Sequence, residues 1–386
     1  MSARTIDLTV APLSELAARR SEKWSQHSPH VLASTVAEMD FPVAEAVTGV
    51  LRTAVERHDF GYPLRAPASL FDAFARFAQR RLDWAPDPAR MALAPDVMVA
   101  LTELARSLAG PGGEVVFASP AYPPFWSAPT AIGLRPVAVP LLASGSLDLT
   151  ALDARLRAGA RVIVLASPHN PTGRVLPRAE LEAVAELADF HEAWVLSDEI
   201  HAPLVLPGAR HVAWHEVSDA ARRRGVVLTS ASKAFNLAGL KAALIVTASP
   251  EADAVVRGLP AIGAHAGLLG VTASEAAFTS GDDWLDAVLA QLAANRDELG
   301  LLLAEHLPAA RWSPPQATYL AWLDLRAYAL PGEAADFLLT QGDVALAAGS
   351  NYDPDAGAGH VRLNFATSPA LLRETVRRMA TAIVSR

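Results

Sequence analysis

Short apolar runs alternate with amphipathic stretches through the middle of this 386-residue chain, and no other feature constrains its fold more. Residues Asp96–Leu108 and Arg178–His191 show helical periodicity. Strands that alternate with helices predict an α/β fold, with a mostly parallel sheet in a large domain and helices on both of its faces. The predicted buried strands are Glu114–Ala118, Arg135–Val139, Arg161–Ala166, Trp194–Ser197, Val226–Ser230 and Ala242–Val246.

The pattern changes after Gly281, where a long helix is predicted over Asp282–His306. Residues Trp312–Leu325 and Ala345–Phe365 are rich in strand-forming residues, and a last helix is predicted over Pro369–Ser385. These elements indicate a smaller α+β domain. We therefore expect three parts: an N-terminal segment that packs on the small domain (residues 1–45), a large domain (residues 46–280) and a small C-terminal domain (residues 281–386).

Composition excludes several classes of site and partner. Cysteine is absent, so disulfides, thiolate metal sites and a cysteine nucleophile are excluded. A formal net charge of −8 argues against a nucleic-acid partner, and no uncharged, proline-free stretch is long enough to cross a membrane. The first 20 residues show no apolar run typical of a secretory signal, so a cytoplasmic protein is expected. His211 and His215 are spaced as metal ligands could be, but no third ligand stands out, and we favour a solvated pair and no metal.

Polar loops follow four of the predicted strands. In parallel sheets ligands bind at the carboxyl ends of strands, so these loops are the candidate site. A lone polar residue at a strand end is usually a cap or a solvated charge, but four such loops at adjacent strand ends are hard to explain in that way. The loops are Ser119–Phe125, Ser167–Gly173, Ser197–His201 and Ser230–Lys241.

This linked set of motifs resembles the fold-type I enzymes that use pyridoxal 5′-phosphate (PLP), the superfamily of aspartate aminotransferase and other class I and II aminotransferases. Within it the chain is most similar to the MalY/PatB-type C–S lyases, the cystathionine β-lyases. The resemblance extends from Lys23-Trp24 through Ala37–Phe41 to Arg362. It implies the PLP-transferase fold, PLP as cofactor, bound by the large domain, and an amino-acid substrate.

Four residues in the loops match the family's cofactor-binding groups. Lys233 is implied to be the catalytic lysine that binds the cofactor's aldehyde and then moves a proton, and the alternative is a surface lysine. Asp198 ends an apolar strand, where an unpaired carboxylate is costly; it is implied to face the pyridine nitrogen, or else it caps a helix. Asn170 is implied to donate to the phenolic oxygen, and it could also form an Asx turn. Tyr122 is implied to cover the pyridine ring, or else it only packs beside prolines.

The resemblance also implies how the phosphate is bound. Val97 and Met98 are the first residues of a predicted helix that Asp96 caps. The backbone N–H groups at the start of a helix bind anions, so these two N–H groups are the candidate phosphate donors. Ser230 matches a phosphate-binding serine. Lys241 stands where the superfamily often has arginine, and a lysine there keeps the positive charge but lacks the planar fork of the guanidinium.

Cis peptide bonds are expected at Asn170-Pro171 and at Ser119-Pro120.

Two further residues carry implications for partner and substrate. Tyr62 resembles the tyrosine that reaches the phosphate of the neighbouring subunit, which implies a homodimer with shared active sites; the alternative is an ordinary turn residue. Arg362 lies between apolar neighbours on a predicted strand and matches the arginine that binds the substrate's α-carboxylate. Its alternative is a charge on an edge strand.

Two reactions on this scaffold begin with removal of the α-proton and then diverge. His201 stands three residues after Asp198, where typical aminotransferases have a tyrosine bonded to the phenolic oxygen, and Ser-Asp-Glu-Ile-His is the form of the C–S lyases. Glu38 stands where these lyases commonly have aspartate. We expect β-elimination on cystathionine or a related cysteine S-conjugate, giving thiol, pyruvate and ammonia. The alternatives are an aminotransferase acting on an amino acid and a 2-oxo acid, and a non-catalytic regulator that keeps the fold.

Overall fold

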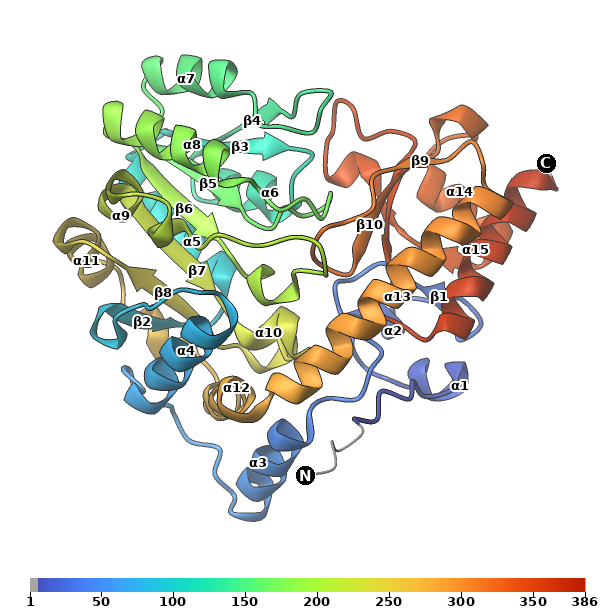
Figure 1. Cartoon of the computed structure of the whole chain (residues 1–386), viewed down its shortest axis with the longest axis horizontal. Coiled ribbons are helices and arrows are strands. Elements are labelled where there is room, and N and C mark those ends of the chain that lie inside the picture. The colour runs from blue at the N-terminus through green and yellow to red at the C-terminus, as the bar shows by residue number, and fades with distance from the viewer. Residues whose placement is uncertain (1–5, 386) are drawn as a thin grey trace.

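The computed structural model describes residues 6–385 as two larger β-sheets and one two-stranded sheet, with helices packed around them (Figure 1). The larger sheet has seven strands in the order β2-β8-β7-β6-β5-β3-β4. Pairing is parallel from β7 to β4, whereas β8 runs antiparallel to both β7 and β2. The prediction of a mostly parallel sheet is thus confirmed. Its strands are β2 (Met91–Ala94), β3 (Glu114–Ser119), β4 (Arg135–Pro140), β5 (Val162–Ala166), β6 (Trp194–Asp198), β7 (Gly225–Thr229) and β8 (Ala243–Thr247).

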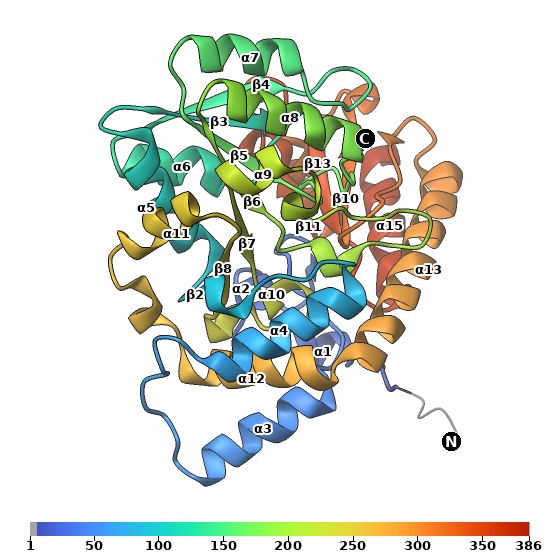
Figure 2. The same cartoon turned by 60° about the vertical axis from the view of Figure 1, so that its left-hand side comes forward.

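Helices cover both faces of this sheet, as predicted (Figure 2). Side chains alternate between the faces: Val115 and Phe117 pack with α5, while Val116 belongs to the core on the other side. All five residues of β5 are buried, which explains why its sequence is apolar throughout rather than alternating. One face carries α5 (Val97–Ala109), α6 (Pro124–Ala131) and α11 (Pro250–Arg257); the other carries α7 (Leu149–Arg157), α8 (Arg178–Phe190) and α9 (Asp219–Arg224).

A third group of helices lies beyond the β2 edge of the sheet and leads to the second sheet. Helix α12 (Leu268–Ser280) packs against α3 (Glu45–Glu56) and α4 (Ala68–Arg81). It is followed by the long α13 (Asp282–His306), whose bounds agree with the prediction. The four-residue α10 (Ala231–Ala234) lies between β7 and β8.

The second sheet is antiparallel and has the order β12-β13-β10-β9. Helix α15 packs against both α13 and α14 beside it. Strand β1 pairs in parallel with β11, so the N-terminal segment lies against the C-terminal part of the chain. The division into residues 1–45, 46–280 and 281–386 stays a prediction. The remaining elements are α1 (Leu13–Leu16), α2 (Glu22–Ser25), β1 (Leu32–Ala33), β9 (Arg311–Trp312), β10 (Leu320–Asp324), α14 (Ala334–Gly342), β11 (Val344–Ala345), β12 (Ala347–Ala348), β13 (His360–Asn364) and α15 (Pro369–Val384).

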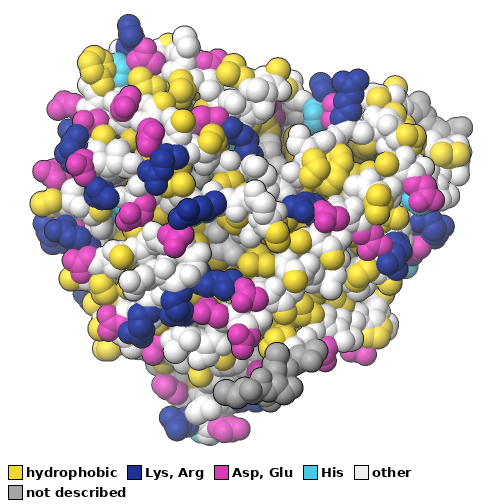
Figure 3. All heavy atoms as spheres, viewed as in Figure 1, with side chains coloured by type: hydrophobic (Ala, Val, Ile, Leu, Met, Phe, Trp, Pro, Cys, Tyr) yellow, Lys and Arg dark blue, Asp and Glu magenta, His cyan; other side chains and the backbone are white. Residues whose placement is uncertain are grey.

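Three features of the backbone and surface complete the description. The peptide bonds before Pro120 and Pro171 are cis, as predicted, and the bond before Pro168 is cis as well. Among residues 6–385, no helix combines the length and the apolar character needed to cross a membrane. On the face drawn in Figure 3, acidic and basic side chains are interspersed rather than gathered by sign.

Candidate active site

A cavity of about 700 Å³ lies between the two sheets, at the carboxyl ends of the parallel strands. The loops that follow β3, β5, β6 and β7 line one side of it, and β12, β13 and residues 35–37 line the other. The structure therefore brings together side chains that are far apart in the sequence. The predicted site residues that line the cavity are Val97, Met98, Tyr122, Asn170, Asp198, His201, Lys233, Lys241 and Arg362.

Lys233 presents a buried amine to this cavity. It lies on the short helix α10, directly after β7, and its Nζ donates to the carbonyl of Ala37 at 3.1 Å. Burial lowers the pKa of Lys233 to about 8, and the nearby Arg362 acts in the same direction, whereas Glu38 and Asp198 oppose the shift. An amine with this pKa is partly neutral near physiological pH, which is the form that attacks an aldehyde or accepts a proton.

Asp198 is the last residue of β6 and is buried in the cavity wall. Its Oδ1 accepts the Ile200 N–H at 3.1 Å, and no ion pair involves this carboxylate in the described part of the chain. Burial raises its pKa to about 6, although the Ile200 bond and Lys233 oppose the shift. A buried carboxylate without a paired cation suits a ligand with a positively charged group, such as a protonated pyridine nitrogen.

His201 is buried in the cavity wall, three residues after Asp198, and its Nδ1 has no hydrogen-bond partner among the described residues. Burial, with Lys233 and Arg362, lowers its pKa to about 3, so the imidazole is neutral. Its ring meets Tyr319 edge-on at 6.2 Å between centroids. A buried nitrogen without a partner in the wall of a cavity indicates that a ligand atom completes it.

Arg362 reaches the cavity from the central strand β13 and is buried without a carboxylate partner among the described residues. One terminal nitrogen donates to Asn170 Oδ1 at 3.1 Å, and the other donates to the Thr35 carbonyl at 2.8 Å. Its Nε has no partner, and the guanidinium lies 4.9 Å from the centroid of the Tyr352 ring. A buried guanidinium with an open donor is suited to bind a carboxylate.

The N-terminus of α5 and a lysine form an anion-binding end of the cavity. Asp96 caps the helix, as predicted, by accepting the Val99 N–H at 2.7 Å. The first helical residues, Val97 and Met98, have N–H groups that the helix itself cannot satisfy. Lys241 Nζ lies 3.1 Å from Asp96 Oδ2, so its charge also faces this end. Together with Lys233, Asp198 and His201, these donors fit a flat aldehyde cofactor that carries a phosphate.

Two predicted residues lie outside the cavity lining. Ser230 is buried, and its hydroxyl donates to the Ala242 carbonyl at 2.6 Å and accepts the Ser232 N–H, so it caps α10 instead of facing the cavity. Its predicted role at the phosphate stays a prediction. Tyr62 is 93% exposed and does not line this chain's own cavity, so its predicted role at a neighbouring subunit stays a prediction.

The sequence interpretation missed several wall residues. Ser232 lines the cavity one residue before Lys233, and its position between the strand end and the lysine could have indicated this. Tyr352 lies under the Arg362 guanidinium, and residues of α2 and α14 lie at the edge of the cavity. No local pattern marks these residues, because their contact with the site depends on how the second sheet docks.

Lysine occurs in the sequence only at positions 23, 233 and 241. Lys233 and Lys241 both line the cavity. Lys23 is buried nearby and forms an ion pair with Asp40, beside the segment whose Ala37 carbonyl accepts from Lys233. The lysines of this chain are therefore concentrated at one place in the fold.

The interpretation of His211 and His215 as a solvated pair was wrong. Both are buried: His211 Nε2 lies 3.0 Å from Glu199 Oε2, and His215 Nε2 lies 3.2 Å from the Gly225 carbonyl. The sequence does not show that the 3₁₀ turn Trp214–Glu216 packs into the core, where Trp214 and His215 are both buried. In residues 6–385, no group of at least three His, Cys, Asp or Glu side chains is arranged to hold a metal ion.

Comparisons with known proteins agree with this geometry. The family model for class I and II aminotransferases matches residues 38–379. A protein of Mycobacterium leprae, described as a proposed cystathionine beta-lyase, is 41% identical over 97% of both chains. Cystathionine beta-lyase PatB of Bacillus subtilis is 34% identical over 90% of this chain and 91% of its own. A crystal structure from Corynebacterium diphtheriae, described as a proposed PLP-dependent beta-cystathionase, matches with a TM-score of 0.93 and 34% identity, covering 98% of this chain and 99% of that one.

Proposed function

Because the chain belongs to the family of class I and II aminotransferases, we propose that it is a PLP-dependent C–S lyase. It catalyses β-elimination on cystathionine or a related cysteine S-conjugate and releases a thiol, pyruvate and ammonia. Relatives at 34–41% identity carry the name cystathionine beta-lyase, which favours this reaction over transamination. The observation that carries the proposal is the buried Lys233 amine, held in one cavity with an unpaired carboxylate and an unpaired guanidinium.

The residues that would hold PLP follow from the donors in the cavity. Lys233 would bind the aldehyde, Asp198 would face the pyridine nitrogen, and the Val97 and Met98 N–H groups together with Lys241 would bind the phosphate. The remaining wall residues around the ring are Tyr122, Asn170 and the neutral His201. When bound, PLP supplies an electron sink that stabilises negative charge at the substrate's α-carbon.

Lys233 carries the proton in the proposed reaction. In its free form the Lys233 amine, whose pKa burial lowers to about 8, would be the base that removes the α-proton. The electron pair of the broken Cα–H bond forms the Cα=Cβ bond as the Cβ–S bond breaks, and the sulfur leaves as a thiolate that then takes up a proton. Water adds to the remaining unsaturated amine, which gives pyruvate and ammonia.

Arg362 orients the substrate for this step. Its guanidinium is held by Asn170 and by the Thr35 carbonyl, which leaves Nε without a partner. A planar fork fixes the direction of a carboxylate as well as its position. The α-hydrogen of a substrate bound in this way can be directed at Lys233 Nζ.

We also propose a homodimer with shared active sites. The loop after α3 exposes three large apolar side chains, Phe60, Tyr62 and Leu64. Exposed apolar groups of this kind are typical of surfaces that a partner covers. Tyr62 of each chain would then reach the phosphate in the other. A cytoplasmic location stays a prediction.

Incubation with cystathionine in the absence of any 2-oxo acid tests the proposed reaction. Because the chain has no cysteine, a thiol reagent reports the released thiol without background from the protein. We expect thiol and pyruvate in equal amounts, and neither with the Lys233→Ala variant. Product that forms only after a 2-oxo acid is added would instead favour the aminotransferase.

A further inference from the structure

Residues 35–40 form a connecting segment without regular secondary structure that is held almost entirely by side chains. Each of its six consecutive carbonyl oxygens accepts a hydrogen bond from a side chain of another part of the chain. The donors are Arg362 to Thr35 (2.8 Å), Asn364 to Val36 (2.7 Å), Lys233 and Tyr319 to Ala37 (3.1 and 2.9 Å), Asn364 and Lys23 to Glu38 (2.6 and 3.4 Å), Asn236 to Met39 (2.9 Å) and Arg19 to Asp40 (3.3 Å).

The 35–40 segment links the proton-moving amine to the carboxylate-binding arginine. Lys233 donates to the carbonyl of Ala37, and Arg362 donates to the carbonyl of Thr35, two residues earlier. These two donors come from opposite sides of the cavity, α10 and β13. The conformation of the segment therefore fixes the position of one reactive group relative to the other.

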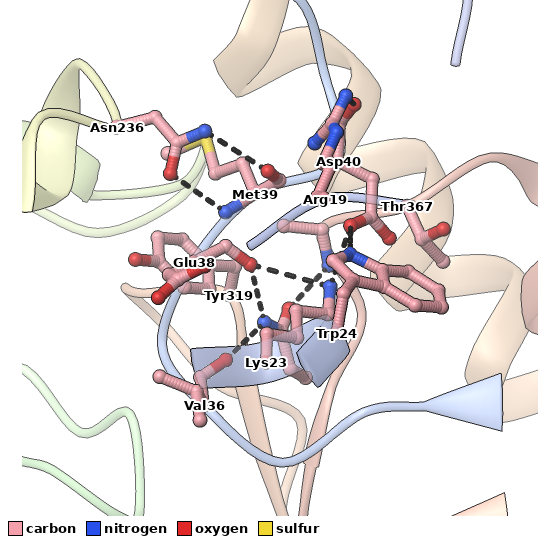
Figure 4. Close-up of polar contacts among 12 residues, drawn as sticks. Arg19, Lys23, Trp24, Val36, Glu38, Met39, Asp40, Asn236, Tyr319 and Thr367 are labelled. Carbon is pink, nitrogen blue, oxygen red and sulfur yellow. Dashed lines mark hydrogen bonds and ion pairs between the residues drawn. The ribbon is translucent and has the colours of Figure 1, made fainter. Parts of the chain in front are cut away.

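Paired contacts on both sides make this segment rigid. Asn236 bonds Met39 twice, because its Oδ1 accepts the Met39 N–H and its Nδ2 donates to the Met39 carbonyl, both at 2.9 Å (Figure 4). Asn364 Nδ2 bridges the carbonyls of Val36 and Glu38 from the other side. Asn236, which follows α10, and Asn364, the last residue of β13, thus both hold the segment by paired hydrogen bonds.

A buried ion pair anchors the end of the segment. Lys23 Nζ lies 2.9 Å from Asp40 Oδ1, and the side chains are 1% and 2% exposed. Trp24 Nε1 donates to the same oxygen at 3.0 Å (Figure 4). Removing one charge of a buried ion pair leaves the other charge buried without a partner, which is strongly unfavourable. The Lys23–Asp40 pair therefore anchors the segment only while both side chains are charged.

We propose that Asp40, Lys23 and Asn236 are positioning residues, which act through the 35–40 segment to set the distance between Lys233 Nζ and the Arg362 guanidinium. The inference rests on the proposed function of these two groups. None of the three positioning residues lines the cavity. Their effect on the reaction is therefore transmitted by the backbone carbonyls of Thr35 and Ala37.

The Asp40→Asn holoenzyme tests this proposal, because the substitution keeps the shape and the acceptor for Trp24 but removes the charge opposite Lys23. Two readouts are measured beside thermal stability: the pH midpoint of the visible absorption band of the bound cofactor, and kcat separately from KM. The midpoint reports the surroundings of Lys233, whose charged neighbours are Arg362, Glu38, Asp198 and Lys241. We expect the midpoint to shift, and kcat to fall by about tenfold or more with a smaller change in KM.

A second variant and a control decide the outcome. Asn236→Gly removes both hydrogen bonds to Met39. Glycine tolerates the positive φ of 59° at this position, so the substitution does not strain the backbone. If Asp40→Asn does not fold, the result with Asn236→Gly decides the proposal. Leu181→Ala truncates a core residue of α8 and should lower thermal stability while leaving the midpoint and kcat as in the wild type. If the Asp40→Asn and Asn236→Gly enzymes fold and keep the wild-type kcat and the wild-type pH midpoint of the absorption band, the positioning inference is overturned while the proposed function stands. A wild type without cofactor absorption or pyruvate formation would overturn the proposed function together with it.

Discussion

Acylation of the cofactor-free chain over a pH series is a direct test of the electrostatics around Lys233. Burial, with Arg362 nearby, lowers the pKa of Lys233 from 10.5 to about 8. At pH 8 about half of the Lys233 amines are therefore neutral, against about 0.3% of amines that titrate at 10.5, a difference of about 150-fold. Only the neutral amine reacts with an acylating reagent.

The assay is clean because lysine occurs only at positions 23, 233 and 241. A small acylating reagent is applied from about pH 6 to about pH 11, and peptide mass spectrometry measures the modification of Lys233 against an added lysine amide whose α-amine is acetylated, so that only its side-chain amine reacts. Burial slows the absolute rate, so the midpoint of the pH profile is compared rather than the rate. We expect a midpoint near 8 for Lys233, and a higher midpoint in Arg362→Gln, which removes a neighbouring positive charge. A wild-type midpoint for Lys233 that coincides with that of the lysine amide would refute the reasoning.

The same shift has a consequence for stability. The unfolded chain, with a lysine pKa of 10.5, binds more protons than the folded chain between pH 8 and pH 10.5. This group therefore makes the cofactor-free protein more stable as the pH rises through that interval, and its contribution is smallest below pH 8.

Three substitutions extend the test to other parts of the molecule. Arg362→Lys keeps the charge but loses the planar fork, so KM for the amino acid should rise by about tenfold or more, as measured by steady-state kinetics. Asp198→Asn keeps the shape but not the charge, and it should weaken cofactor binding, measured by absorbance titration, and lower kcat by about 100-fold. Leu292→Ala truncates a fully buried residue of α13 and should lower the free energy of unfolding by about 2–5 kcal/mol without changing cofactor binding, as measured by chemical denaturation.

The strands could be predicted where the local sequence agrees with the tertiary environment. Strand β5 is a continuous apolar run because both faces of the sheet are covered, and its predicted bounds differ by one residue. Strand β2 was missed, because Met91–Ala94 has no β-branched residue and contains two alanines. The antiparallel direction of β8 was not predicted either, although the stretch after β7 lacks the long crossover helix that a parallel neighbour needs.

The site was predicted to the extent that its residues follow strands. Asn170, Asp198 and Lys233 come together because the strands before them end at the same edge of one sheet. Ser230 lies in the same loop as Lys233, but the demand of a short helix for an N-cap takes its hydroxyl away from the cavity. The 35–40 segment could not be predicted, because a segment held by distant side chains has neither helical nor strand periodicity.

The scarcity of lysine limits how many side chains of this protein can react with free aldehydes. The other strongly basic side chains are all arginine, whose guanidinium stays protonated and does not condense with aldehydes as a neutral amine does. Lys23 is sealed in its ion pair, so Lys241 is the one remaining side-chain amine open to solvent. Excess pyridoxal 5′-phosphate should therefore produce few off-target adducts on this protein, and reconstitution should approach one cofactor per chain without prior protection of the surface.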